Sequence, residues 1–85
     1  MTPQEAFRIH NASQHRLPMW TITERPRDYP EGYVARMHYS LPRPAVTPYA
    51  LHAQSLAEVR RLLPPGLYRL GRSPQDDPVI VETWL

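Results

Sequence analysis

The chain has 85 residues, enough for one domain with a thin hydrophobic core. It contains no cysteine, which excludes disulfides, thiolate metal sites and thiol nucleophiles. The chain has ten basic residues, all of them arginine, and eight acidic ones. The resulting net charge of +2 is too small to require a polyanionic partner. Arginine without lysine fits a GC-rich bacterial genome, and selection for arginine's planar fork at phosphates or carboxylates is the alternative.

Neither a membrane span nor a signal peptide is evident in the sequence. The longest purely aliphatic run is Val79-Ile80-Val81, far below the length that crosses a bilayer. Residues 1–18 lack the apolar region of a secretory signal. We therefore expect a cytoplasmic protein that makes no contact with membrane.

Residues 1–18 differ from the rest of the chain. Thr2 is a good N-cap with Glu5 three residues on, but only Phe7 and Ile9 are strongly apolar, and they form no helical stripe. We expect a mobile N-terminal arm or a short helix that the fold does not need. Met19 can serve as an alternative translation start, which leaves 19–85 as a single α+β domain.

Residues 19–85 read as strands separated by proline-rich loops and one helix. Eleven prolines are roughly two and a half times the usual share. Three of them place 41–48 in a loop, because proline cannot feed the ladder of a central strand. The predicted strands are 19–24, 33–40, 49–53, 67–70 and 78–85.

The predicted helix begins at the N-cap Ser55 and ends before Pro64. Its apolar stripe consists of Leu56, Val59, Leu62 and Leu63. The order β-β-β-α-β-β predicts a single antiparallel sheet of four to five strands with one helix packed on one face. The helix should cover the sheet positions Met37, Tyr39, Tyr49 and Leu51, and on the last strand Ile80 and Trp84 should share a face.

Asp76 and Asp77 are adjacent carboxylates, which can indicate a metal site or only a turn. Prolines flank them, and no histidine or further carboxylate lies at ligand spacing, so we interpret them as part of a turn, with Asp76 closing an Asx-turn. If the strands around 41–48 pair near Tyr39 and Tyr49, then Arg36, His38 and His52 share one exposed face. Two histidines beside an arginine do not make a metal site.

No catalytic, cofactor-binding or metal-binding residue is predicted. The serines lie in no nucleophile elbow, and the three glycines form no phosphate-binding loop. The sequence indicates no cofactor and no small-molecule substrate, and we expect a protein that is not an enzyme.

The stretches "WTITERPRDYPEGYVAR" and "RSPQDDPVIVETWL" carry a pattern of short motifs. The pattern consists of Trp20, Asp28-Tyr29-Pro30, Val34-Ala35-Arg36, Asp76-Asp77-Pro78 and Glu82-x-Trp84-Leu85. In this the chain resembles a group of small bacterial proteins for which no activity is established. The resemblance covers most of residues 19–85 and implies no cofactor or catalytic residue.

The leading functional hypothesis is a protein-interaction module, with self-association as one form of it. A helix of about nine residues is roughly 13 Å long and covers only part of a five-stranded sheet about 20 Å wide. A tryptophan should then stay partly exposed for a partner. The candidate interaction surface comprises Trp20, Arg36, His38, His52 and Trp84. The alternative is arginine-based binding of nucleic acid.

Overall fold

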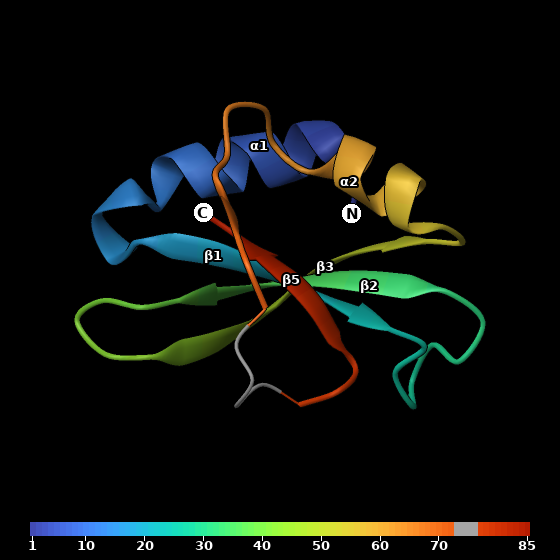
Figure 1. Ribbon diagram of the computed structural model, residues 1–85. Coiled ribbons are helices and arrows are strands. Elements are labelled where there is room, and N and C mark those ends of the chain that lie inside the picture. The colour runs from blue at the N-terminus through green and yellow to red at the C-terminus, as the bar shows by residue number, and fades with distance from the viewer. Residues whose placement is uncertain (73–76) are drawn as a thin grey trace.

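The computed structural model describes residues 1–72 and 77–85. The fold is α+β: one antiparallel sheet of five strands, in the order β3-β2-β1-β5-β4, carries two helices on one face (Figure 1). The elements are α1 (Pro3–Ala12), a 3-10 turn η1 (Gln14–Arg16), β1 (Pro18–Glu24), β2 (Tyr33–Tyr39), β3 (Ala45–Ala53), α2 (Leu56–Leu62), β4 (Arg69–Leu70) and β5 (Ile80–Trp84). The predicted fold class is confirmed, and the second packed helix is the main difference from it. No helix in the two described ranges is long and apolar enough to cross a membrane.

The hydrophobic core lies between the sheet and the helices and is built on the central strand β1. Cross-strand partners point to the same face of a sheet. Trp20 pairs with Met37, while Ile22 pairs with Ala35, which in turn pairs with Leu51. These five side chains are buried in one cluster. The prediction that Met37 and Leu51 face the helix layer is confirmed.

Helix α1 is anchored on this core, although residues 1–18 were expected to form a mobile arm or a short, loosely held helix. Its N-terminus is capped as predicted, since Thr2 Oγ1 accepts a hydrogen bond from the Glu5 backbone N–H at 3.1 Å. Ala6 and His10, one turn apart, are both buried. Residues 3–12 thus form a helix, which was one of the two expectations, and a small residue and a histidine make its contact with the core, neither of which counts as strongly apolar in a sequence pattern.

Helix α2 begins and packs as its sequence predicts. Ser55 Oγ accepts a hydrogen bond from the Glu58 backbone N–H at 3.1 Å. Val59 is fully buried and Leu63 nearly so, and the other two leucines of the stripe are half-buried against the same cluster. The helix ends before Leu63, whose extended backbone leads into Pro64.

Strand β3 begins earlier than predicted, because residues 41–48 are not all loop. It starts at Ala45 and includes Pro48. A proline is tolerated there because β3 is an edge strand whose register against β2 shifts at this point. Tyr39 consequently pairs with Ala45, and the expected pairing near Tyr49 is wrong.

Strand β5 contains an irregularity that changes which side chains share a face. Trp84 pairs with Trp20 and Ile80 pairs with Thr23, with a register shift between Ile22 and Thr23. Because Trp20 and Thr23 are three residues apart on β1, they point to opposite faces. The prediction that Ile80 and Trp84 share a face is therefore wrong.

Candidate functional site

Trp20, predicted for an exposed interaction surface, is fully buried. Its indole Nε1–H donates to Nδ1 of His10 at 3.1 Å, so α1 covers this part of the sheet. A buried side chain cannot contact a partner, and the prediction for Trp20 is wrong because it assumed a single covering helix. Trp84 lies beside it on the same face and is half-buried.

Arg36, His38 and His52 lie together on the sheet face that the helices leave uncovered. The register places His52 opposite Val34, and Arg36 and His38 point to the same face as Val34 because they lie two and four residues after it on β2. Arg36 forms an ion pair with Asp28. This ion pair lies within the chain, and a binding role for Arg36, His38 and His52 stays a prediction.

His38 shares a hydrogen bond of 2.9 Å with the Thr21 hydroxyl. Burial lowers the pKa of His38 below its ordinary value, so the ring is predominantly neutral at pH 7. Among residues 1–72 and 77–85, no group of three or more His, Asp or Glu side chains is placed to hold a metal ion.

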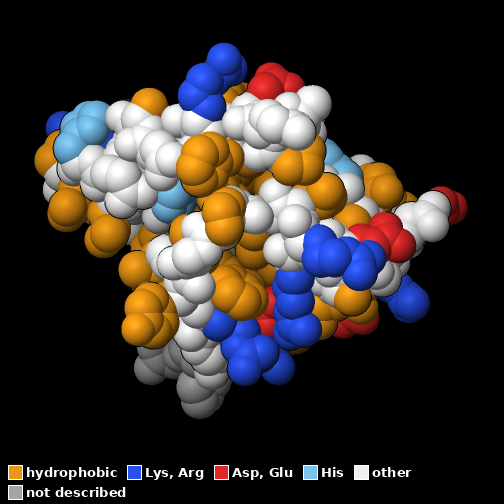
Figure 2. All heavy atoms as spheres, turned by 90° about the horizontal axis from the view of Figure 1, so that it is seen from above, with side chains coloured by type: hydrophobic (Ala, Val, Ile, Leu, Met, Phe, Trp, Pro, Cys, Tyr) orange, Lys and Arg blue, Asp and Glu red, His pale blue; other side chains and the backbone are white. Residues whose placement is uncertain are grey.

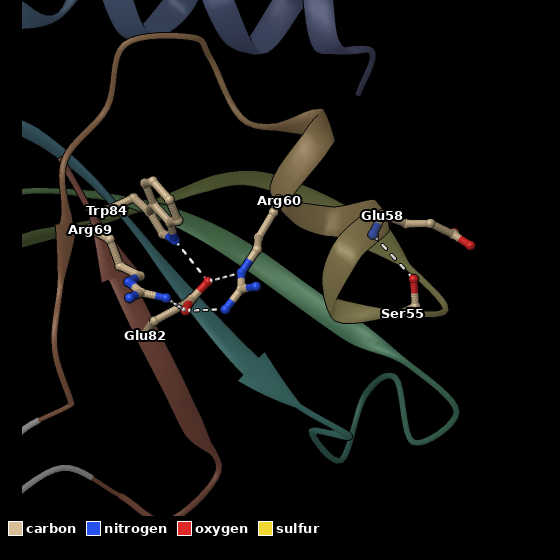
Figure 3. Close-up of polar contacts among 6 residues, drawn as sticks. All are labelled: Ser55, Glu58, Arg60, Arg69, Glu82 and Trp84. Atoms are coloured by element: carbon tan, nitrogen blue, oxygen red, sulfur yellow. Dashed lines mark hydrogen bonds and ion pairs between the residues drawn. The ribbon is translucent and has the colours of Figure 1, made fainter.

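A carboxylate with two arginine partners lies where the end of α2 meets β4 and β5 (Figure 3). Glu82 of β5 points to the helix side and is only 4% exposed. Its Oε1 accepts hydrogen bonds from Arg60 Nε at 2.6 Å and from Trp84 Nε1 at 3.0 Å. Its Oε2 accepts from Arg60 Nη2 at 2.8 Å and lies 3.7 Å from Arg69 Nη1. We call these four residues the Glu82 cluster.

The Glu82 cluster carries a net positive charge at neutral pH. The hydrogen bond from Arg60 is the main cause that lowers the pKa of Glu82, and it outweighs the raising effect of burial. Glu82 is therefore ionised at pH 7 and offsets one of the two guanidinium charges. The cluster can attract an anion, and nothing in it supplies a nucleophile with an adjacent base.

These residues cannot be grouped from the sequence, because Arg60 and Glu82 are 22 positions apart. The one available signal was an acidic residue inside the apolar run of the last strand, where a buried carboxylate needs a charged partner. That signal identifies Glu82 but does not say which arginine reaches it.

A second surface feature lies between α1 and the segment after α2. Pro3, Gln4, Phe7 and Pro65 line an open, mostly apolar depression of about 320 Å³. Phe7 remains 44% exposed there. Figure 2 shows apolar side chains at the surface over the middle of the helix side, with arginine and acidic side chains near them.

Asp77 takes part in a turn that leads into β5. Its Oδ1 accepts a hydrogen bond from the Val79 backbone N–H at 3.1 Å, which is an Asx-turn, and its carbonyl accepts from the Ile80 N–H at 2.9 Å. The predicted Asx-turn at Asp76 lies outside the described residues. The turn interpretation therefore has direct support at Asp77.

No family model, curated protein or solved structure matches this chain. The resemblance of residues 19–85 to a group of small bacterial proteins stays a prediction from the sequence.

Proposed function

We propose that the protein is a non-catalytic module that binds a segment of another protein chain on its helix side. The observation that carries this proposal is the open apolar depression at Pro3, Phe7 and Pro65. An aromatic ring held on a helix beside two prolines loses little conformational entropy on binding. Such rigid, partly exposed aromatic groups are typical anchors of protein interfaces.

The sheet is less suited to binding a partner than the helix side is. Helices cover one face, and both edges have features that oppose the addition of a strand: β3 contains Pro48 and a register shift, and β4 has two residues. Proline, bulges and short edge strands are common means of preventing edge-to-edge pairing. The proposed binding surface is therefore the helix side and not an edge of the sheet.

The size and openness of the depression favour a side chain of a partner over a free small molecule. Its volume of about 320 Å³ is at the low end of ligand pockets, which enclose roughly 300–1,000 Å³. An open site does not surround a small ligand. It can hold one large apolar side chain whose chain continues over the surface.

The net charge of the chain favours an acidic partner segment. The whole chain carries a net charge of +2, and Figure 2 shows arginine side chains, with acidic ones beside them, near the apolar middle of this side. A net positive charge speeds the approach of an acidic chain and disfavours basic ones. The occupant we propose is a segment with one leucine or aromatic residue flanked by Asp or Glu.

Fluorescence anisotropy with a labelled, glutamate-rich peptide that contains one leucine tests this proposal. Phe7→Ser should weaken binding by about tenfold, as expected for loss of an interface anchor. Val46→Ser is the matched control, because Val46 is 93% exposed on the edge strand β3, away from the depression. It should leave binding unchanged.

Equal effects of the two substitutions, or equal binding of a peptide whose leucine is replaced by serine, would contradict the proposal. Binding of an oligonucleotide that weakens steeply with salt and ignores Phe7→Ser would instead favour the alternative, an arginine-based nucleic-acid binder. Self-association that Phe7→Ser abolishes in sedimentation would identify the occupant as a second copy of the chain.

A further inference from the structure

The Glu82 cluster holds two guanidinium groups close together at the surface. Arg60 Nη2 and Arg69 Nη1 both lie within ion-pairing distance of the same oxygen, Oε2 of Glu82. Two like charges at this separation repel each other, and the buried carboxylate offsets that repulsion. Glu82 is thus a positioning residue for the two arginines.

Within residues 1–72 and 77–85, Glu82 is the only side-chain partner of either guanidinium group, so both arginines have donors for a further ligand. Arg60 uses Nε and Nη2 on Glu82, which leaves Nη1 directed away from the carboxylate, and Arg69 approaches it with Nη1 alone. The side chains are 38% and 57% exposed, whereas Glu82 is buried beneath them. An anion arriving from solvent therefore meets the guanidinium groups before it meets the carboxylate.

We propose that Arg60 and Arg69, positioned by Glu82, bind the phosphate group of a phosphate monoester. The three terminal oxygens of such a group can engage two guanidinium groups at once, whereas a carboxylate has only two oxygens and one charge. A monoester carries close to two negative charges at neutral pH. This site is separate from the depression at Phe7 and does not depend on the function proposed there.

The two tryptophans provide a reporter and an internal reference for the test. The Trp84 indole N–H donates to Glu82 within the cluster, while the Trp20 indole N–H donates to His10 in the core. A ligand bound at Arg60 and Arg69 should shift the Trp84 indole resonance in ¹H–¹⁵N spectra. The Trp20 resonance should stay in place and show that the fold is unchanged.

The experiment titrates the full chain with phenyl phosphate, inorganic phosphate, dimethyl phosphate and acetate at constant ionic strength. Phenyl phosphate and inorganic phosphate should shift Trp84 at lower concentration than the monoanions do. Arg69→Gln should weaken the binding of phenyl phosphate by about tenfold or more, the usual effect of losing a charge-assisted contact. Arg61→Gln, which removes an equal charge from the same surface next to Arg60, should change it less than about twofold.

Equal weakening by Arg61→Gln and Arg69→Gln would overturn the proposal, because it would indicate a diffuse positive field. Equal affinity for dimethyl phosphate, or for acetate, would also overturn it, because a monoanion would then suffice. Stronger binding of inorganic phosphate than of phenyl phosphate would support the site with the free anion as its ligand, and the reverse order would support an ester. An oligonucleotide that binds more tightly than both and responds to Arg61→Gln would overturn the monoester assignment.

Discussion

The two tryptophans of this chain are cross-strand neighbours with opposite chemical surroundings. Trp20 of β1 pairs with Trp84 of β5, and both side chains point to the helix side. The Trp20 indole donates to His10 of α1 in the core, and the Trp84 indole donates to Glu82 in the Glu82 cluster. Helix α1 therefore contacts the sheet through a hydrogen bond between neutral groups, and helix α2 contacts it through an ion pair.

The two contacts differ in the charge of the acceptor, since His10 and Glu82 are both buried. His10 accepts the indole proton only while its ring is neutral, and burial lowers the pKa of His10, which keeps it so. Glu82 accepts only while it is ionised, and Arg60 holds the pKa of Glu82 below its ordinary value. The neutral contact stabilises the core at no cost of burying a charge, whereas the ionic contact keeps two arginines ordered at the surface.

Removal of residues 1–18 should have the largest effect, because it deletes the neutral contact together with its helix. Full exposure of the Trp20 side chain costs about 4–6 kcal/mol, from about 150–250 Å² of area at about 25 cal/mol per Å². That is a large part of the stability of so small a domain. Thermal unfolding followed by circular dichroism should show a midpoint lower by many degrees, or no transition at all. An unchanged midpoint would restore the expectation that these residues are dispensable.

Glu82→Gln should have the next largest effect and lower the free energy of unfolding by about 1–3 kcal/mol. It leaves the donors of Arg60 without a charged acceptor in a largely buried place. Glu58→Gln is the control: Glu58 is exposed on α2, and its backbone N–H, not its carboxylate, is what Ser55 binds. The control should cost less than about 0.5 kcal/mol in urea unfolding. Equal losses would mean that the ionic contact does not stabilise the fold.

The smallest expected effect concerns the pH dependence of the free energy of unfolding, which distinguishes the His10–Trp20 contact from the Glu82 cluster. A histidine whose pKa is lower in the folded protein than its ordinary 6.5 binds protons more readily when unfolded. Its contribution is complete above pH 6.5 and is lost as the pH falls through the folded value. Glu82, whose folded pKa lies below 4.5, loses its contribution in the same direction but only below pH 4.5.

His10→Gln should remove the part of the stability loss between pH 8 and pH 5 that protonation of His10 causes. An amide oxygen accepts the indole proton at every pH in this range. At pH 8 it should cost no more than about 1.5 kcal/mol. Burial also lowers the pKa of His38, so His38 contributes to the slope in the same pH window, and His38→Gln should remove that contribution. Urea unfolding between pH 8 and pH 5 measures both. A stability loss between pH 8 and pH 5 that is unchanged in the double variant would show that His10 and His38 do not cause it.

Local patterns in the sequence were enough for several elements. The cap at Ser55, the stripe around Val59 and the stop at Pro64 predicted α2, and strict alternation predicted β2 and its buried Met37. These signals work because each depends on residues within one or two turns of each other, or on one face of one strand. The α+β class followed from their order.

Long-range packing decided the rest. The anchoring of α1 depends on Ala6 and His10 meeting Trp20 on a strand, and nothing near His10 in the sequence marks it as a buried acceptor. The side of the sheet to which Ile80 points depends on a register shift between β5 and β1. Hydrogen bonding between the two strands sets this shift. The partners of Glu82 come from α2 and β4, so only the packing of three elements could bring one carboxylate and two arginines to a single point.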